Sequence, residues 1–202
     1  GSEEQAHQVV VQAEALGTEA IAVQGDLRES GAPARIFQET RKAFGQVDIL
    51  VNSAAIFRRG TLLDITEANW DEHLAVNLKA PFFLCQEFAR QFSEGQHGHI
   101  INIADWRALR PGVAYVAYVL SKSALITMTQ SLALALGPAV QVNAIAPGAV
   151  VPPPGDDGSY FAKVARRIPA RRIGSSREIV KAMLYLLDSD FVTGEVLLVT
   201  GG

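Results

Sequence analysis

Tyr118 and Lys122 lie four positions apart in the stretch AYVAYVLSKSALITMTQSLALAL, residues 114–136. Residues at this spacing share one face of a helix, so the sequence places a phenol and an ammonium together on an otherwise mostly apolar helix. A neighbouring cation favours the phenolate and lowers the pKa of a tyrosine. The pair could then protonate an alkoxide or an amide-like nitrogen as a hydride arrives. The alternative is a half-buried tyrosine beside a lysine that extends its ammonium into solvent, the commoner arrangement for such a pair taken alone.

Apolar runs of strand length alternate with longer segments of helical spacing along the chain. We expect strands at 19–27, 47–55, 98–105, 140–148 and 195–202. We expect helices at 32–45 with Gly45 as the stop, at 67–93 with an interruption near Asn77, at 114–136, and at 176–189 with Ser175 or Ser176 as the cap. This alternation predicts a parallel α/β sheet with helices on both faces, in one domain that spans 1–202. The Pro- and Gly-rich residues 147–160 predict an irregular segment, and we expect 149–172 to form a flap over the substrate.

Small or polar residues follow four of the expected strands. They are Asp26 and Leu27, then Asn52, Ser53, Ala54 and Ala55, then Asp105, and finally Pro147 and Gly148. In open parallel sheets, ligands bind at the carboxyl ends of the strands. A plain strand exit or turn explains one such end, whereas four together indicate a ligand site.

Seven motifs, taken in order, resemble the short-chain dehydrogenase/reductase family. They are GDL at 25–27, NSAA at 52–55, VNLKAPF at 76–82, INIAD at 101–105, YVLSK at 118–122, VNAIAPG at 142–148 and TGEVLLVTGG at 193–202. The resemblance covers nearly the whole chain. It implies a Rossmann-like, doubly wound parallel sheet and a nicotinamide-dependent oxidoreductase.

The resemblance also implies roles for individual residues. Tyr118 is expected to be the proton donor, and Lys122 to lower its pKa and hold the nicotinamide ribose. Asn77 is expected to open its helix around a water that leads to Lys122, the alternative being a surface asparagine at a helix break. The residues expected to bind the cofactor are Asp26, Leu27, Asn52, Ser53, Ala54, Tyr118, Lys122, Pro147, Gly148 and Val150.

Asp105 stands where the family usually has serine, thirteen residues before Tyr118. This departure resembles the pteridine reductase branch, which includes dihydromonapterin reductase-like proteins. A carboxyl group beside a phenol can pass a proton to a ring nitrogen, which a serine hydroxyl does less readily. The alternative is that Asp105 caps the turn before Trp106 and Arg107. The residues expected to contact substrate are Asp105, Tyr118, Ile56, which stands where that branch has an aromatic ring, and Phe57, which follows it.

The family's first strand, its glycine-rich turn and its second strand do not occur in the sequence. That turn holds the dinucleotide pyrophosphate on a helix N-terminus, and the end of the next strand selects between a free and a phosphorylated ribose. We therefore expect the sequence to be incomplete at its N-terminal side, with an omitted start favoured over a true deletion. In such a sheet, segment 19–27 would either leave a gap beside 47–55 or pair with it directly.

Composition narrows the partners and the location. Apolar residues make up 49% of the chain and charged residues 19%, which fits a folded core, and the net charge of −3 provides no basic field for nucleic acid. The single cysteine, Cys85, cannot form an internal disulfide and suits the cytoplasm. Polar breaks in every long apolar run lead us to expect no membrane span, and we expect no metal ion at the site. By resemblance, the apolar helices with Phe82, Phe83 and 125–134 imply a homotetramer or homodimer.

These observations favour an NADPH-dependent short-chain reductase that acts on a small, pterin-like C=N substrate. NADP(H) is expected from the resembling branch, with NAD(H) as the alternative. A second hypothesis is a carbonyl reductase of 3-oxoacyl or sugar-like substrates. A third is a truncated, non-catalytic protein with the same fold.

Overall fold

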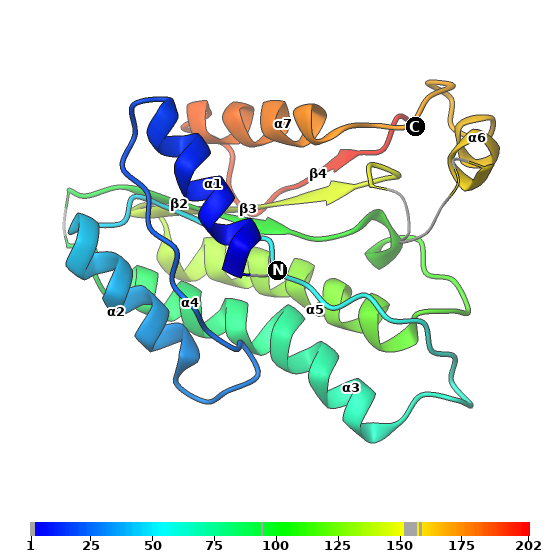
Figure 1. The fold of residues 1–202 in the computed structure, drawn as a ribbon, viewed down its shortest axis with the longest axis horizontal. Helices are drawn as coiled ribbons and strands as arrows, with labels where there is room; N and C mark the ends of the chain where they lie inside the picture. The colour runs from blue at the N-terminus through cyan, green and yellow to red at the C-terminus, as the bar shows by residue number, and fades with distance from the viewer. Residues whose placement is uncertain (1–2, 94, 152–156, 158) are drawn as a thin grey trace.

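A parallel sheet lies between two layers of helices in the computed structural model, which describes residues 3–93, 95–151, 157 and 159–202 (Figure 1). Within these residues the strands follow the order β1 (Ile49–Asn52), β2 (Gly98–Ile103), β3 (Val140–Pro147) and β4 (Val196–Val199). All neighbouring strands are parallel, and Asn52 stands opposite Asn102 in the register of β1 and β2. The expected parallel α/β architecture is therefore confirmed.

The helices cover both faces of this sheet (Figure 1). In chain order they are α1 (Glu3–Ala15), α2 (Ala32–Phe44), α3 (Glu67–Leu74), α4 (Ala80–Ala89), α5 (Val116–Leu136), α6 (Ser159–Ala165) and α7 (Ser176–Asp188). Side chains of a strand alternate between the faces, so Ile100 packs into a core with α2, α4 and α5, whereas Ile101 packs with Leu186 of α7. The two faces of the sheet therefore have separate cores, one with α2, α4 and α5 and one with α7.

Several helix ends follow directly from the sequence. Gly45 ends α2 with a positive φ of 80°, a conformation that glycine adopts without strain. Ser175 begins α7 with a capping box, in which the side chain of Glu178 bonds back to the Ser175 backbone N–H. Both ends agree with the sequence-based expectation.

The helical stretch after residue 67 changes its winding at Asn77, as expected. Between α3 and α4 lies a π-helical turn, η1 (Ala75–Lys79), in which the Ala80 N–H bonds to the carbonyl of Ala75. Pro81 has no N–H, so the carbonyl of Asn77 loses its normal α-helical donor, and the helix widens at this point. The π turn places the Asn77 side chain in a fully buried position.

The expected strand at 19–27 is wrong. Residues 18–26 run as an extended connection that forms no ladder within the described chain, and residues 27 and 28 form a turn. Direct pairing with β1 does not occur, since β1 pairs with β2 alone among the described strands. The run forms no strand because an apolar run becomes one only where a partner satisfies its backbone groups. Helix α1, which precedes this segment, was not expected, and it has no buried residue.

The flap expected at 149–172 is partly described. Residues 152–156 and 158 lie outside the described part of the chain, and α6 follows them. Helix α5 is long and apolar enough to cross a membrane by length and composition, which the polar breaks in its sequence had not led us to expect. A core helix meets the same description, and α5 packs on β3 and contributes Leu125 and Met128 to the core.

Candidate active site

A cleft of about 630 Å³ opens at the carboxyl ends of β1, β2 and β3. Helices α5 and α7 and the segment after β3 complete its walls. Most lining side chains are apolar or small, and the charged ones among them are Asp105, Arg107 and Lys122. The fold thus brings Asp105, Tyr118 and Lys122 together at the edge where open parallel sheets bind their ligands.

Asp105 uses its two carboxylate oxygens differently. Oδ1 accepts a hydrogen bond from the backbone N–H of Arg107 at 2.7 Å and so caps the short 3₁₀ turn η2 (Trp106–Ala108). Oδ2 accepts a hydrogen bond from the hydroxyl of Tyr118 at 2.8 Å. The capping role and the partnership with Tyr118, which the sequence leaves as alternatives, occur together.

Tyr118 lies on α5 with only 6% of its surface exposed. Burial raises the pKa of its hydroxyl far above the ordinary value, the Asp105 carboxylate raises it further, and Arg107 opposes the rise. The expected lowering of the Tyr118 pKa is therefore wrong as a net direction, because burial and Asp105 outweigh the attraction of a nearby ammonium. The Lys122 nitrogen lies 6.0 Å from the centroid of the Tyr118 ring, and burial and Asp105 decide the direction.

Lys122 is nearly enclosed, with 3% of its surface exposed. Its ammonium donates a hydrogen bond to the backbone carbonyl of Ile103, at the end of β2, over 2.6 Å. Burial lowers the pKa of Lys122 from 10.5 to about 8, against the charge of Asp105, which raises it. The ammonium form still predominates at neutral pH and supplies positive charge behind Tyr118.

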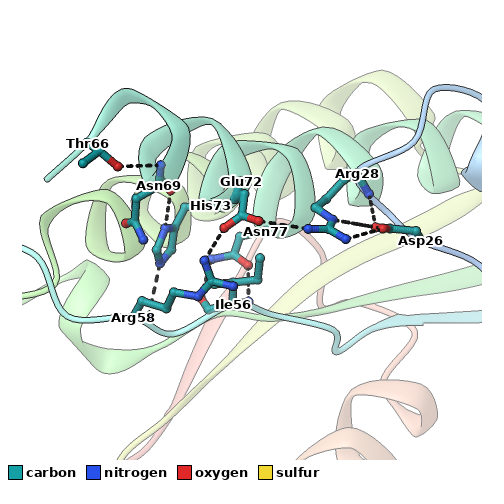
Figure 2. Close-up of polar contacts among 9 residues, drawn as sticks. All are labelled: Asp26, Arg28, Ile56, Arg58, Thr66, Asn69, Glu72, His73 and Asn77. Carbon is teal, nitrogen blue, oxygen red and sulfur yellow. Dashed lines mark hydrogen bonds and ion pairs between the residues drawn. The ribbon is translucent and has the colours of Figure 1, made fainter. Parts of the chain in front are cut away.

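Asn77 positions the loop after β1 (Figure 2). Its Oδ1 accepts from the backbone N–H of Ile56 at 2.7 Å, and its Nδ2 donates to the carbonyl of Ile56 at 3.0 Å. Nδ2 also donates to the hydroxyl of Ser121, one residue before Lys122 on α5. Among the described residues the Asn77 side chain contacts Ile56 and Ser121 rather than Lys122, so it acts here as a positioning residue.

His73 lies one turn before Asn77 and holds the same loop two residues further on (Figure 2). The backbone N–H of Arg58 donates to His73 Nε2 at 3.3 Å, which leaves the proton on Nδ1, and Nδ1 lies 2.7 Å from the carbonyl of Asn69. The imidazole is fully buried. His73 and Asn77 therefore fix the backbone on both sides of Phe57.

Phe57 forms an aromatic wall of the cleft. Its ring stacks on Tyr115 at a centroid distance of 4.4 Å and meets Tyr118 edge-on at 4.6 Å. Of the two residues expected to contact substrate after β1, Phe57 lines the cleft and Ile56 does not, because the backbone of Ile56 is turned toward Asn77.

The expected cofactor-binding residues divide into two groups. Those that line the cleft are Ser53, Tyr118, Lys122, Pro147, Gly148 and Val150. Those that do not line it are Asp26, Leu27, Asn52 and Ala54. The structure thus gathers six of the ten expected cofactor-binding residues in the cleft and places the other four elsewhere.

Asn52 faces the core instead of the cleft. Its amide donates to Asn102 Oδ1 at 2.9 Å and to the sulfur of Cys85 at 3.3 Å, and Asn102 donates in turn to Thr129 of α5. The chain of buried amides ties β1, β2 and α5 together. The side chain of Asn52 is therefore occupied inside the fold.

Asp26 is held by its neighbour Arg28 (Figure 2). The Arg28 Nε donates to both carboxylate oxygens at 3.0 Å, and hydrogen bonding to Arg28 lowers the pKa of Asp26 to about 2. Arg28 also donates to Glu72 of α3 at 3.0 Å, and Glu72 accepts a further hydrogen bond from Arg58. This chain of ion pairs joins the segment before α2 to the loop that carries Phe57.

Small residues stand at two strand ends of the cleft. A Cβ atom at Gly148 would lie 2.8 Å from the Cα of Thr200, so glycine is needed there for the chain to pack against the residue that follows β4. Ser53 and Ala55 line the opposite strand end with short side chains. The cleft can therefore accept a planar group between β1 and β3, in front of Tyr118.

Sequence reasoning missed three residues of this site. His73 lies four positions before Asn77, the same spacing that drew attention to Tyr118 and Lys122, so a search for polar pairs on one helix face would have found it. Arg107 follows the strand-end acid by two positions but was read only as part of a turn. Tyr115 has a left-handed backbone with φ 63°, which helical spacing cannot reveal.

Comparison with protein families and known proteins gives consistent relatives. A family model described as enoyl-(acyl carrier protein) reductase matches residues 2–202. The (2S)-[(R)-hydroxy(phenyl)methyl]succinyl-CoA dehydrogenase subunit BbsD of Thauera aromatica is 36% identical over 196 residues, which cover 93% of this chain and 77% of that protein.

Solved structures resemble the fold closely. FolM alternative dihydrofolate reductase 1 from Brucella canis, complexed with NADP, superposes with a TM-score of 0.91 at 30% identity, over 100% of this chain and 80% of that one. The short-chain dehydrogenase/reductase from Serratia marcescens superposes with a TM-score of 0.92 at 31% identity, over 100% of this chain and 84% of that one.

Proposed function

This chain belongs to the short-chain dehydrogenase/reductase family, and from that premise we propose that it is an NADPH-dependent reductase of a pterin-like C=N bond in a small, flat substrate. The observation that carries the proposal is the hydrogen bond of 2.8 Å from the Tyr118 hydroxyl to Asp105. A carboxylate in this position gives the phenol a second proton-handling group in the same cleft.

The chain's own groups supply the proton. Burial keeps the Tyr118 hydroxyl protonated, and its hydrogen points at Asp105 Oδ2. When bound, a reduced nicotinamide supplies the hydride. Reduction of a C=N bond takes up the hydride at carbon and one proton at nitrogen. Tyr118 supplies that proton when its hydroxyl turns from Asp105 Oδ2 to the substrate nitrogen, and the phenolate that results is stabilised by the nearby ammonium of Lys122 and regains a proton from solvent.

The aromatic wall supports a flat substrate. Phe57 and Tyr115 stack with an angle of 7° between their rings, and both rings line the cleft. A heteroaromatic ring gains from packing on such a surface beyond its buried area. This wall lies against the Tyr118 ring, so a ring packed on it would place its edge near the hydroxyl.

NADP(H) is the cofactor we infer, with NAD(H) as the alternative. The FolM structure from Brucella canis is complexed with NADP, and it superposes over the whole of this chain. The residues that would hold the nicotinamide side are Ser53, Tyr118, Lys122, Pro147, Gly148 and Val150. A fluorescence titration with NADPH tests this inference directly, and it also separates an enzyme from a non-catalytic protein of the same fold.

A carbonyl reductase of 3-oxoacyl or sugar-like substrates is the second candidate function. The relative BbsD is a dehydrogenase by name, and a phenol beside a buried ammonium also serves carbonyl chemistry. In this proposal Asp105 separates the two functions, because a carboxyl group beside the phenol helps to pass a proton to a ring nitrogen, which a serine hydroxyl does less readily.

The test compares turnover of 7,8-dihydropterin with turnover of a 3-oxoacyl thioester. We expect the wild type to reduce dihydropterin, and Asp105→Ser to lose this activity while it retains any activity on the thioester. The matched control is Asp71→Ser, an exposed aspartate on α3 that does not line the cleft. Activity of the wild type on the thioester alone contradicts the pterin function and favours the carbonyl reductase.

Association into a homotetramer or homodimer is part of this proposal. An apolar groove of about 540 Å³ lies between α4 and α5, lined by Leu78, Phe82, Phe83 and Met128 among others. Phe82 and Phe83 pack edge-on and are both exposed, as expected of a surface that a second copy covers. Light scattering with the variant Phe82→Glu, which we expect to be monomeric, tests this association.

A cytoplasmic location is also inferred. Cys85 is a free, buried thiol, and burial raises its pKa to about 12, so it is not a reactive thiolate. A chain whose single cysteine serves as a small core residue fits a reducing compartment. Fractionation of cells that express the protein tests the location.

A further inference from the structure

We propose that Arg107 is the specificity-determining residue of this cleft and that its guanidinium binds an oxygen acceptor carried by the substrate close to the reduced bond. The acceptor is either the lactam oxygen of a neutral heterocycle or the carboxylate of an oxo acid, since both oxygens take N–H donors in the same way. This inference rests on the proposed reductase function and names a feature that its substrate must have.

Arg107 is the reachable cation among the described residues of the cleft. In that part of the chain three charged side chains line the cleft, two cations and one anion: Lys122, Arg107 and Asp105. The ammonium of Lys122 is nearly enclosed and already donates to the carbonyl of Ile103. The side chain of Arg107 is 28% exposed, so a molecule in the cleft meets its charge first.

The N–H donors of the Arg107 guanidinium are unused within the described part of the chain. Its Nη1 lies 3.6 Å from Asp105 Oδ2, which is an ion pair but longer than a hydrogen bond. Within the described part of the chain, the guanidinium makes no hydrogen bond, although its planar fork carries several N–H donors. An oxygen acceptor in the cleft can take two of them side by side.

The Arg107 guanidinium is held in place by its neighbours. It lies over the ring of Trp106 at 5.0 Å and over the ring of Phe57 at 5.7 Å, while the backbone N–H of Arg107 is fixed by Asp105. A guanidinium packed between rings and a carboxylate loses little freedom when it binds an acceptor. It is therefore a preorganised binding group rather than a mobile surface side chain.

The Arg107 guanidinium lies close to the proton donor Tyr118. Asp105 Oδ2 lies 2.8 Å from the Tyr118 hydroxyl and 3.6 Å from Arg107 Nη1. A single carboxylate oxygen thus contacts both the proton donor and the guanidinium. A substrate atom protonated at Tyr118 can therefore lie close to an oxygen bound by Arg107, which favours an acceptor near the reduced bond over a distant tail.

The test uses substrate pairs in which the proposed acceptor is removed, as in the lactam arm, or made neutral and weaker, as in the carboxylate arm; in the carboxylate arm the acid counts as the oxygen-bearing member. For the lactam arm, 7,8-dihydropterin is compared with 2-amino-7,8-dihydropteridine, which lacks the 4-oxo group. For the carboxylate arm, phenylpyruvate is compared with its methyl ester. Both pairs are measured with the wild type, Arg107→Gln, Arg107→Lys, and the control Arg110→Gln, an exposed arginine on the same loop that does not line the cleft.

We expect Arg107→Gln to lower kcat/KM about 10- to 100-fold for the oxygen-bearing member of one pair and by less than about threefold for its partner, as loss of a charge-assisted hydrogen bond predicts. Arg107→Lys should recover only part of this loss, because a lysine cannot bind bidentately. The arm in which the difference occurs identifies the source of the oxygen. An equal effect on both members of both pairs, no effect, or the same loss in Arg110→Gln overturns the proposal.

A binding measurement keeps this test separate from that of the proposed function. Isothermal titration of the same four compounds needs no turnover, and circular dichroism confirms that each variant is folded. Weaker binding of the oxygen-bearing compound by Arg107→Gln supports the role of Arg107 even if none of the compounds is reduced, which would contradict the reductase function alone. Equal binding by wild type and variant overturns the role of Arg107.

Discussion

Replacing Lys122 with methionine is expected to stabilise the folded protein at neutral pH while it removes activity. Lys122 is 3% exposed, and its ammonium has exchanged water for one hydrogen bond to a backbone carbonyl. Methionine has a similar length and carries no charge, so it fills the same space without the cost of desolvation. Activity is lost because the positive charge behind Tyr118 disappears.

The magnitude follows from the pKa of Lys122, which burial lowers from 10.5 to about 8. Each pH unit of such a difference corresponds to about 1.4 kcal/mol, so the buried ammonium costs on the order of 3 kcal/mol of folding free energy below pH 8. Loss of the hydrogen bond to Ile103 offsets about 1 to 2 kcal/mol of the gain in the variant. The net stabilisation at about pH 7 is therefore on the order of 1 to 2 kcal/mol.

The pH dependence gives the sharper test, since the lost hydrogen bond contributes equally across the range. Between about pH 8 and 10.5 the unfolded chain holds the Lys122 proton and the folded chain has released it. The unfolded state then binds more protons, so the stability of the wild type rises with pH relative to the variant. The advantage of Lys122→Met should shrink by about 2 kcal/mol between pH 8 and pH 9.5.

The assay is urea unfolding of both proteins at about pH 7, 8 and 9.5, followed by circular dichroism. Lys181→Met, which removes an exposed lysine of α7, serves as the control and should show no such trend. A difference between wild type and Lys122→Met that stays constant with pH, or grows toward alkaline pH, would refute the reasoning that burial decides the protonation of Lys122.

Three further changes test other parts of the site. Tyr118→Phe should lower kcat about 100- to 10,000-fold while NADPH still binds, measured by initial rates and fluorescence titration, because it removes the proton donor; retained turnover contradicts this role. Gly148→Ala should weaken NADPH binding at least tenfold, because its Cβ would lie 2.8 Å from Thr200 Cα and would displace the wall of the cleft at this strand end, and unchanged affinity would argue against a role of this wall in binding. His73→Phe should cost about 1 to 3 kcal/mol in urea unfolding and raise KM more than it lowers kcat, because the Arg58 N–H loses its buried acceptor; equal effects on both constants would point to a structural role alone.

Local signals carried most of the fold. Gly45, Ser175 and the polar break at Asn77 mark helix boundaries through their own backbone chemistry, and the structure has those boundaries. The apolar run at 19–27 has no such local determinant. Whether it forms a strand depends on a partner in register, and that is a tertiary property.

The sequence predicts which residues gather at the site but not the direction of the pKa shift of Tyr118. Tyr118, Lys122 and Asp105 lie together as their spacing along strand and helix requires. The direction of the Tyr118 pKa was predicted with the wrong sign, because burial cannot be read from a spacing of four residues and here exceeds the effect of a nearby cation. Likewise, the buried amide of Asn52 follows from its packing against β2, which strand-end position alone does not reveal.

The Phe57 loop is attached to His73 and Asn77, so the residues that position this loop differ from those that transfer the proton. The side chains that handle the proton lie just after β2 and on α5, whereas the backbone of the Phe57 loop is held by α3 and the π turn after it. Substitutions on the buried face of α3 can therefore shift the Phe57 ring without replacing an acid–base group. A directed-evolution library for new substrates would include this face of α3 beside Arg107 and the other residues of the cleft.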